Sequence, residues 1–409
     1  MNTADIRRQR GVPRFAGSGG CSVRPHLGGT FVNRYRRTAP TGPARRDFVR
    51  AGLGAVGLTA VGGPLLAACG SSASKSAASV GTGTTGPGPK NFGTLTYRLS
   101  WVENVEFAGA YIADSKGYYK AEGFSGLSII PGGPSATPME TDVVTKKAIV
   151  AISSPDITGA AVAKGAPLKI IGAQYQKNPF VIMSMADKPI AKPEDMYGKK
   201  IGVQGANESV WNAFLAAAKL DASKITKVPV QFDPTPLTQG TVDGWFSFIT
   251  NEPVDLGMKG FKVATMMLAD HGYPLVSEVY IVRADTIASQ RPLLKALLRA
   301  EIKGWTDNLK DPGLGASLTV NTYGKSLGLK VDEQALESKA ENLLILNAET
   351  KTNGIFTVTD ALIEQNIATL KTGGLNLSAS QLFDLSLLKE VYQEDPGLIA
   401  ALPAVPTPA

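Results

Sequence analysis

The stretch LSWVENVEFAGAYIADSKGYYKAEG, residues 99–123, sets the expectation for the fold. It predicts the end of a β-strand over 95–99, a polar turn, and one amphipathic helix that Gly117 ends. Asn104 is a candidate N-cap, because its side-chain oxygen can accept a hydrogen bond from the free N–H groups of the first turn. Trp101 stands just beyond the carboxyl end of the strand, where open α/β sheets bind their ligands. The stretch therefore predicts a βα unit with a candidate stacking surface at its open end.

The other aromatic residues of this stretch fit core packing better than ligand contact. They are Phe107, Tyr111, Tyr118 and Tyr119, and large aromatic side chains at helical spacing are usually buried in a core. For Trp101, packing and ligand contact both stay open, since its position rather than its hydrophobicity makes it a candidate.

The net charge of +7 comes from the front of the chain. Of the 42 basic and 35 acidic residues, residues 1–68 hold eleven Arg and two Asp, which leaves 31 basic and 33 acidic residues in the remainder. A protein that binds nucleic acid neutralises phosphates with an excess of Lys and Arg. The remainder has no such excess, so we expect no nucleic-acid partner.

Residues 1–68 have the parts of an export leader. Arg45 and Arg46 precede an uncharged run rich in Ala, Gly, Val and Leu, and the pair resembles a twin-arginine signal. The run ends in LAAC, residues 66–69, which resembles the box at which bacterial lipoproteins are cut before a cysteine that then carries lipid. We expect cleavage before Cys69, lipidation of its thiol, and anchoring at the outer face of the cytoplasmic membrane. The alternative is an uncleaved anchor with an incidental cysteine.

Cysteine and histidine are too few for a metal site in the body of the protein. Cys21 leaves with the leader, Cys69 is expected to carry lipid, and His271 is the one histidine beyond the leader. These counts exclude a disulfide, a thiolate metal site and a site of several histidines, and we expect no metal and no cofactor.

Residues 69–92 are rich in Gly, Ser and Thr, which predicts a flexible tether.

Beyond the tether, short apolar runs alternate with amphipathic ones, which is typical of α/β layers. We expect the chain to cross to a second lobe after the apolar run at 181–185, through a loop with prolines at 189 and 193. It returns by the strand SEVYIVR, residues 277–283. The expected division is therefore lobe I at 93–185 plus 277–400, lobe II at 186–276, and a disordered tail at 401–409.

Polar side chains follow several of the predicted strands, at the edge where such sheets bind ligands. Hydroxyls and amides at strand ends and helix starts can bind a polar group, but the same residues serve as N-caps or solvated loop residues, and both interpretations stay open. Glu252 is likewise either a ligand contact or a solvated carboxylate near a helix N-terminus. Besides Trp101 and Asn104, the candidates are Ser154, Gln174, Tyr175, Gln204, Asn207, Asn251 and Glu252.

Four segments, taken in order, resemble a known family. They are residues 101–123, YGKKIGV at 197–203, GTVDGWFSFITNEP at 240–253, and SEVYIVRADTIASQRPLLKALLRAEIKGWTDNLKDP at 277–312. They resemble the substrate-binding proteins of ABC importers, in the branch with binders of thiamine-pyrimidine precursors, riboflavin and alkanesulfonates and the fungal thiamine-pyrimidine synthase. The resemblance implies a two-lobed α/β fold of the periplasmic-binding-protein type II. It also implies a monomer that closes over one small ligand, with an ABC permease and its ATPase as partners.

The resemblance also implies a ligand class. Pyrimidine-precursor binders use an aromatic residue after the first strand, polar residues in the next turn and a glutamate in the second lobe, and Trp101, Asn104 and Glu252 occupy the matching places. The chain lacks the aromatic residue that those binders have between asparagine and glutamate at 251–252, so riboflavin or another flat heterocycle fits as well as a pyrimidine. Sulfonate and nitrate binders come second, because Lys177 is the one cation in the loops assigned to the cleft.

An enzyme is the remaining alternative. The fungal synthase consumes an active-site histidine and needs iron held partly by a cysteine-rich motif, and this chain has no such motif. No paired carboxylate or nucleophile–base set is visible for acid–base or covalent catalysis. We therefore expect a binding protein rather than an enzyme, which captures its ligand by hinge closure.

Overall fold

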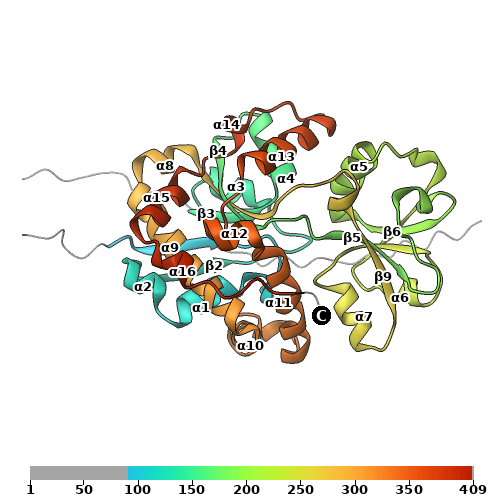
Figure 1. Ribbon diagram of the computed structural model, residues 1–409, viewed down its shortest axis with the longest axis horizontal. Coiled ribbons are helices and arrows are strands. Elements are labelled where there is room, and N and C mark those ends of the chain that lie inside the picture. The colour runs from blue at the N-terminus through green and yellow to red at the C-terminus, as the bar shows by residue number, and fades with distance from the viewer. Residues whose placement is uncertain (1–90, 408–409) are drawn as a thin grey trace, which may run out of the picture. The chain divides into compact units, whose positions relative to one another are not determined.

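Two five-stranded mixed sheets form the framework of residues 91–407, which are the residues that the computed structural model describes (Figure 1). Each sheet carries its own helices, and we call each sheet with its helices a lobe. The expected leader, its Arg45 and Arg46, the lipidation site Cys69 and nearly all of the tether lie outside the described residues. Within the described residues, no helix is both long enough and apolar enough to cross a membrane.

The first lobe is built on a sheet with the strand order β2-β1-β3-β10-β4. Its strands are β1 (Thr94–Arg98), β2 (Gly126–Ile130), β3 (Val150–Ser153), β4 (Leu168–Tyr175) and β10 (Ser277–Arg283). β1 is parallel to β2 and β3, whereas β10 runs antiparallel to β3 and β4. The antiparallel direction of β10 follows from its origin, because the chain enters this strand on its return from the second lobe.

The second lobe is built on a sheet with the strand order β7-β6-β8-β5-β9. Its strands are β5 (Phe180–Met185), β6 (Lys200–Gln204), β7 (Thr226–Val230), β8 (Gly244–Phe248) and β9 (Val263–Met267). β5 pairs antiparallel with both β8 and β9, so the chain crosses between lobes at 176–179. The crossing was expected after residue 185, and this pairing shows that it comes before β5 instead. An apolar run predicts a buried strand, but it does not predict to which of the two sheets that strand belongs.

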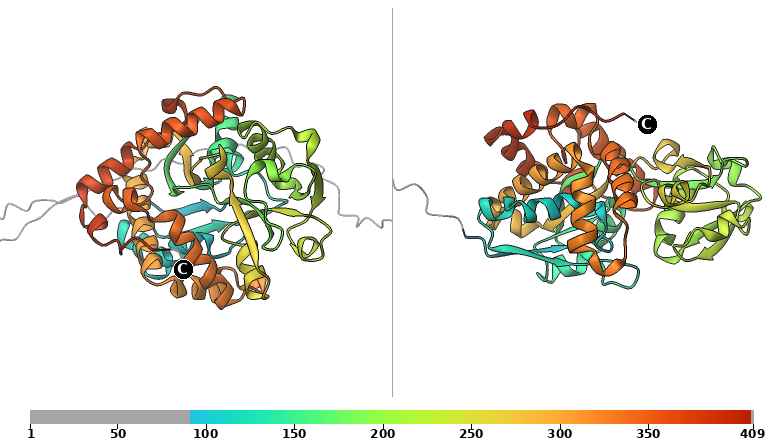
Figure 2. Two further views of the ribbon diagram at one scale, coloured as in Figure 1. Left: turned by 45° about the vertical axis from the view of Figure 1, so that its right-hand side comes forward. Right: turned by 90° about the horizontal axis from the view of Figure 1, so that it is seen from below.

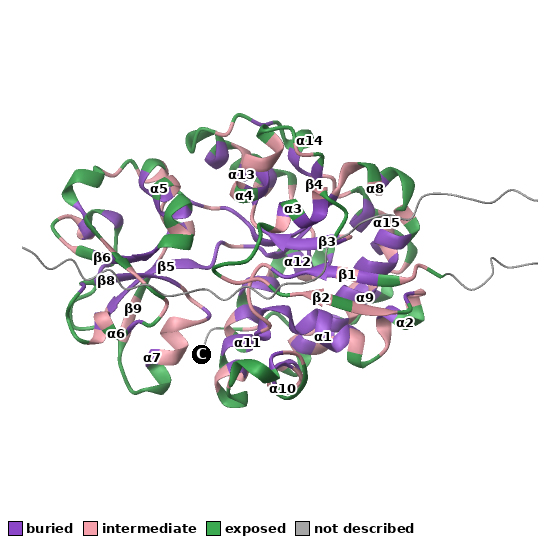
Figure 3. Cartoon of the chain, turned by 180° about the vertical axis from the view of Figure 1, so that it is seen from behind, coloured by how far each residue is buried: buried purple, intermediate pink, exposed green. Residues whose placement is uncertain are grey.

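Helices cover both sheets. In the first lobe they are α1 (Ala108–Ser115), α2 (Tyr118–Glu122), α3 (Met139–Val144), α4 (Pro155–Ala163), α8 (Ala284–Ser289), α9 (Arg291–Lys310), α10 (Pro312–Leu318), α11 (Val331–Ile345), α12 (Ala348–Asn353), α13 (Asp360–Thr372), α14 (Ala379–Leu382), α15 (Ser386–Glu394) and α16 (Gly397–Ala400). In the second lobe they are α5 (Glu208–Ala217), α6 (Thr235–Thr238) and α7 (Glu252–Met258). Figure 2 shows the orange and red helices of the last part of the chain gathered around the first sheet. Figure 3 shows that the strands are mostly buried while the outer turns of the helices are exposed.

The opening stretch forms the predicted βα unit with some changes in detail. After β1, a short 3-10 helix η1 (Val105–Phe107) leads directly into α1, and Gly117 ends this helical segment with φ +70°. Asn104 occupies the N-cap position of η1, but its side chain makes no capping hydrogen bond. The capping expectation is therefore wrong for the side chain, which is buried instead of reaching the helix start.

The end of the chain is more ordered than expected at its first residues. Leu402 is buried, and its carbonyl oxygen accepts a hydrogen bond of 2.5 Å from Lys351 Nζ. The stretch 401–409, expected to be a disordered tail, therefore contains one residue, Leu402, that packs in the core of the first lobe.

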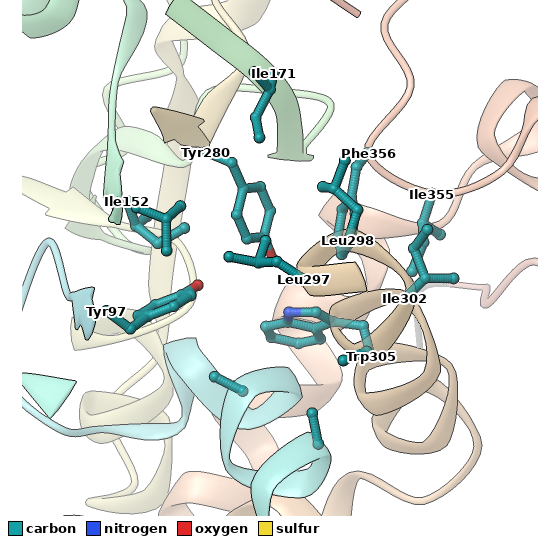
Figure 4. Packing of buried hydrophobic residues seen from close by; sticks show 14 of the residues in the cluster. Tyr97, Ile152, Ile171, Tyr280, Leu297, Leu298, Ile302, Trp305, Ile355 and Phe356 are labelled. Carbon is teal, nitrogen blue, oxygen red and sulfur yellow. The ribbon is translucent and has the colours of Figure 1, made fainter. Parts of the chain in front are cut away.

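The core of the first lobe depends on the close approach of α1 and α9. Figure 4 shows Trp305, Leu297 and Tyr280 facing one another in this core. Gly109 of α1 lies directly against the Trp305 ring, and a Cβ atom at Gly304 of α9 would overlap the Gly109 carbonyl oxygen. The two helices can approach this closely only because neither position carries a side chain.

Gly304→Ala is expected to lower the free energy of unfolding by about 1–2 kcal/mol, because overpacking costs more than the helix propensity that alanine gains. Gly257→Ala in α7 is the matched control, since a Cβ atom there meets nothing within 4 Å, and it is expected to stabilise slightly. Thermal denaturation of both variants measures the difference. Equal stability of the two variants would show that α1 and α9 are not packed in this way.

Candidate ligand-binding cleft

A cavity of about 270 Å³ lies between the two lobes. Its residues come from strand ends and helix starts, as expected for an open α/β sheet. The first lobe contributes Ser100, Trp101, Glu106, Met139, Ser153, Ser154, Ile157, Ser277 and Glu278. The second lobe contributes Phe180, Ala206, Asn207, Val210, Phe232, Ser247, Phe248, Asn251 and Glu252. Both lobes therefore supply walls to one cavity of a size that suits a small molecule.

Aromatic rings form much of the cavity wall. Trp101, just beyond β1, lies 5.0 Å from the ring of Phe232, just beyond β7, with an angle of 60° between the ring planes. Phe180 at the start of β5 packs edge-to-face against Phe248 at a centroid distance of 4.5 Å. These rings offer flat apolar faces from both lobes, which is the surface that a planar ring system needs for stacking.

Glu252 presents a carboxylate from the second lobe. It is the first residue of α7, and its Oε2 accepts hydrogen bonds from Ser247 Oγ at 2.8 Å and from the Phe248 backbone N–H at 3.2 Å. Burial raises the pKa of this carboxyl, while the hydrogen bonds from Ser247 and Phe248 oppose that rise. The hydrogen bonds fix the side chain beside Asn251, which also lines the cavity.

Glu106 and Glu278 present two further carboxyls from the first lobe. Glu106 lies on η1 and Glu278 on β10, and they are 5% and 4% exposed. Ser100 Oγ donates a hydrogen bond of 2.8 Å to Glu278 Oε2. Burial raises the pKa of Glu106 to about 7, and burial together with the charge of Glu106 raises the pKa of Glu278 well above its usual value.

Among the residues that the structure describes, the cavity lining carries acidic groups and no basic side chain. Lys177, the cation considered from the sequence, does not line the cavity and forms an ion pair of 2.7 Å with Asp270. Among residues 91–407, no group of three or more His, Cys, Asp or Glu side chains is arranged to hold a metal ion. The cleft is therefore chemically suited to stacking and to accepting hydrogen bonds.

The structure brings together five of the nine residues proposed from the sequence. Trp101, Ser154, Asn207, Asn251 and Glu252 all line the cavity. Ser154 begins α4 without a side-chain cap, since its Oγ donates to Asp156 Oδ1 at 2.5 Å. Asn207 Nδ2 donates to Gln204 Oε1 at 3.1 Å. These residues stay candidates for ligand contact.

The other four candidates, Asn104, Gln174, Tyr175 and Gln204, are buried and do not line the cavity. Gln174 Nε2 donates to the Glu106 carbonyl oxygen at 3.0 Å, and Gln204 Nε2 donates to the Phe246 carbonyl oxygen at 2.9 Å. β4 extends to Tyr175 and β6 to Gln204, so Gln174, Tyr175 and Gln204 belong to strands rather than to loops at the sheet edge. Of the four, Gln174 and Gln204 bond to backbone carbonyl groups beside the cleft.

Sequence reasoning missed Glu106, Glu278 and the cleft phenylalanines. Glu278 directly precedes the apolar residues 279–282 of β10 and Glu106 lies between Val105 and Phe107, so each is a charged residue beside apolar neighbours. A buried charge needs a partner or a function, and this was the signal available for the two glutamates. Phe180, Phe232 and Phe248 gave no such signal, because aromatic residues at strand ends are ordinary core residues.

The buried glutamates make stability depend on pH. Burial raises the pKa of Glu106 and Glu301 to about 7 and that of Glu337 to about 8, from an unfolded value of 4.5. The folded state therefore binds more protons than the unfolded state between about pH 4.5 and 8, and its stability falls as the pH rises through this window. Ion pairs with Arg291 and Lys295 lower the pKa of Glu390 to about 2, so this residue changes the stability only at pH values below this window.

We therefore expect the midpoint of thermal unfolding to fall steadily from pH 5 to pH 8. Glu301→Gln, which removes one of the titrating carboxyls outside the cavity, is expected to flatten the slope. Thermal denaturation at pH 5, 6, 7 and 8 measures both effects. A midpoint that rises over this range would contradict the buried, protonated state of these carboxyls.

Comparison with known proteins supports the assignment of a family. A family model described as NMT1/THI5 like matches residues 104–313. The chain is 28% identical over 243 residues to the riboflavin-binding protein RibY of Chloroflexus aurantiacus, which covers 56% of this chain and 67% of that protein. It is 23% identical over 216 residues to a 4-amino-5-hydroxymethyl-2-methylpyrimidine phosphate synthase of Legionella pneumophila, covering 51% of this chain and 67% of the synthase.

A solved structure confirms the fold. The periplasmic aliphatic sulphonate binding protein SsuA of Escherichia coli superposes with a TM-score of 0.51 at 15% identity, covering 70% of this chain and 91% of SsuA. At this identity the likeness shows the fold alone, and it confirms the α/β periplasmic-binding-protein fold expected from the sequence. The resemblance to the substrate-binding-protein branch is confirmed as well. Because the family model matches just over half of the chain, the protein belongs to the NMT1/THI5-like family.

Proposed function

We propose that this protein is an extracytoplasmic solute-binding lipoprotein that captures a flat, uncharged or cationic heterocycle and delivers it to an ABC permease. The ligand class is that of riboflavin and the amino-pyrimidine precursors of thiamine. The observation that carries the proposal is the lining of the cavity, which combines aromatic faces with the three carboxyls of Glu106, Glu252 and Glu278 and contains no Lys or Arg. The relation to RibY, whose name states riboflavin binding, supports the same class.

The electrostatics of the cleft separate this proposal from its main competitor. Sulfonates and nitrate carry a permanent negative charge, which sites of this kind balance with cations or many hydrogen-bond donors. Here the described lining offers no cation to balance an anion, and any of its glutamates that is ionised would repel one. The structural likeness to a sulphonate binder therefore extends to the fold and not, in our proposal, to the ligand.

Capture is proposed to occur by closure of the lobes about the two crossing segments. These segments are 176–179, between β4 and β5, and 268–276, between β9 and β10. Two short connections between rigid sheets are typical of a hinge. Closure would bring Glu252 and Asn251 of the second lobe against a ligand stacked on Trp101 of the first. The ligand would then be enclosed by side chains from both lobes.

Delivery and location rest on the leader. The twin-arginine pair Arg45 and Arg46 and the lipobox ending in Cys69 support export followed by lipid anchoring at the outer face of the cytoplasmic membrane. A monomer on a tether of residues 69–92 would present its closed, ligand-bound form to a permease and its ATPase. Labelling of the cells with a radioactive fatty acid tests the anchor, with Cys69→Ala as the control that must lose the label.

We propose binding rather than catalysis, although one relative is a synthase. No His, Cys or Lys side chain lines the cavity, so the cavity offers no nucleophile–base pair of the usual kind. Two serine hydroxyls in the cavity donate hydrogen bonds to its glutamates and hold them in place. Ser247 donates to Glu252, and Ser100 donates to Glu278. Serine without histidine or lysine beside it is a positioning group rather than an activated nucleophile.

Mass spectrometry of small molecules released from freshly purified protein tests the proposal. We expect a flat heterocycle at close to one molecule per protein, and its absence from Trp101→Ala protein purified in parallel. Release of a sulfonate or nitrate would contradict the proposal. If the protein is purified empty, direct titration with riboflavin and with 4-amino-5-hydroxymethyl-2-methylpyrimidine decides, and binding of neither would also contradict it.

A further inference from the structure

The wall of the first lobe contains an unusual arrangement of carboxyls. Glu106 and Glu278 line the cavity, and Glu337 and Glu341 of α11 lie behind them, with all four side chains buried. Within residues 91–407, none of the four takes part in a salt bridge. Buried carboxyls that lack a cation are stable only when they keep protons or when a ligand provides donors.

The two cavity glutamates act on each other. Both line the same cavity, both are buried, and each affects the pKa of the other. Two neighbouring buried carboxyls without a cation cannot both ionise readily, so the pair keeps a proton. Burial raises the pKa of Glu106 to about 7, and burial together with the charge of Glu106 raises the pKa of Glu278 well above its usual value. The proton belongs to the pair and not to one of the two residues.

The backbone at Glu278 supports a functional role for its position. Its φ is +47°, in the left-handed region that residues with a side chain rarely adopt. β10 carries this residue between the cavity-lining Ser277 and the paired residue Val279. Residues held in such conformations concentrate at binding and active sites. Ser100 fixes the resulting orientation by donating to Glu278 Oε2 at 2.8 Å.

The other groups that face the pair contribute no positive charge. Glu341 and Glu337 approach from α11, Tyr175 from β4 and Tyr111 from α1. The Tyr175 hydroxyl and Glu341 Oε2 are buried and have no hydrogen-bond partner among the described residues. Glu252 acts from the second lobe, as one of the charges that raise the pKa of Glu337. The pair therefore sits in an acidic, proton-retaining environment that opens on one side into the cavity.

We propose that Glu106 and Glu278 together form a subsite of the cleft that carries one shared proton. This subsite binds the edge of a heterocycle on which an N–H donor stands beside an acceptor atom. A carboxyl and a carboxylate side by side offer both a donor and acceptors, which is the complement of such an edge. The imide edge of an isoalloxazine ring and the amidine edge of a 4-aminopyrimidine have this pattern. This inference rests on the proposed function and specifies how its ligand is recognised.

The subsite makes ligand affinity depend on pH. The pair loses its first proton near the pKa of Glu106, which burial raises to about 7, and its second proton at a higher pH. Once the second proton is lost, the donor disappears and two like charges face each other, so binding of a neutral ligand must take up a proton. One coupled proton changes affinity up to tenfold per pH unit above this second step. We expect the affinity for a neutral heterocycle to be greatest between the two steps and to fall on the alkaline side, with uptake of up to one proton per ligand bound.

The test is calorimetric titration with riboflavin and with 4-amino-5-hydroxymethyl-2-methylpyrimidine at pH 7, 8 and 9, in buffers of different ionisation heat. Glu278→Gln is the informative variant, because an amide has the donor and acceptor of a protonated carboxyl and cannot titrate. We expect this variant to keep its affinity between pH 8 and 9, where the wild-type affinity falls, and to exceed the wild-type affinity at pH 9. Glu301→Gln is the matched control: Glu301 is equally buried but is satisfied by Tyr119 and Tyr280 away from the cavity, and the variant should keep the wild-type pH dependence of affinity.

Two results would overturn the inference and leave the proposed function intact. One is wild-type affinity that does not change between pH 7 and 9, with no proton exchange. The other is a Glu278→Gln variant that loses the same factor in affinity at every pH, as a merely structural residue would. Absence of binding by either heterocycle at all three pH values would instead contradict the proposed function itself and this inference with it.

Discussion

Replacing Trp101 with alanine is expected to weaken binding of a flat heterocycle about 100-fold, or about 2.8 kcal/mol. The indole lies at the open end of β1, is partly buried, and stands 5.0 Å from Phe232 of the opposite lobe. Central aromatic anchors contribute the largest part of binding energy in cavities of this kind. Removing the ring takes away both the stacking face of the first lobe and the contact between lobes. Isothermal titration calorimetry with riboflavin measures the effect.

Two variants control for this prediction. Trp101→Phe keeps a smaller flat face and is expected to lose less affinity than the alanine variant. Tyr118→Ala removes an aromatic side chain of α2 that hydrogen-bonds Asp307 and does not line the cavity, so its affinity should stay within about twofold of the wild type. If Trp101→Ala bound as tightly as Tyr118→Ala, Trp101 would be a packing residue and no part of the site.

Replacing Glu252 with alanine is expected to weaken binding about 30- to 100-fold, because a hydrogen bond to a charged, buried acceptor contributes about 2–3 kcal/mol. The carboxylate is held toward the cavity by Ser247 and by the Phe248 backbone N–H. Glu252→Gln keeps an oxygen that can accept from both donors and from the ligand. We expect it to lose tenfold or less for a neutral ligand, which separates the role of the acceptor from that of the charge.

Asp255→Ala is the matched control for Glu252. Asp255 lies on the same helix α7, pairs with Lys259 at 2.7 Å and does not line the cavity. Its removal is expected to leave affinity within about twofold of the wild type. An equal loss in Asp255→Ala and Glu252→Ala would mean that the effect comes from the stability of α7 and not from contact with the ligand.

Much of the fold was predictable from the sequence, because the strands are short apolar runs with glycine and polar residues at their ends. Positions that turn the chain, such as Gly117 with its positive φ, are marked by residue type alone. Which sheet receives a strand was not predictable in this way. β5 reads as apolar as any strand of the first lobe, and only its pairing with β8 and β9 assigns it to the second.

Residues of the candidate site were predictable when they lie beyond the end of a strand. They were not predictable when the strand continues through them. Trp101 follows β1 and Glu252 begins α7, so both reach the cavity. Gln174, Tyr175 and Gln204 were placed in loops, but the strands extend through them, and alternate side chains of a strand point to the two faces of a sheet instead of its edge. An error of two residues at a strand end therefore moves a side chain from the cleft into the core.

The two cavity glutamates of the first lobe show a different limit. Glu106 and Glu278 are 172 positions apart in sequence, and no local pattern relates them. The fold brings η1 and β10 to one cavity, and it is their proximity, more than either residue, from which we infer a shared proton. Pairwise electrostatics of this kind depends on tertiary contacts, which a single sequence does not display.

The central claim is that the cleft selects flat neutral or cationic heterocycles against anions, and competitive titration calorimetry at pH 6.5 tests it most directly. Riboflavin, 4-amino-5-hydroxymethyl-2-methylpyrimidine and ethanesulfonate are each titrated into purified protein, alone and in the presence of the other two. We predict micromolar or tighter binding of at least one of the heterocycles, no heat of binding for ethanesulfonate, and no displacement of the heterocycle by ethanesulfonate. Binding of ethanesulfonate, or failure of both heterocycles to bind, would contradict the claim.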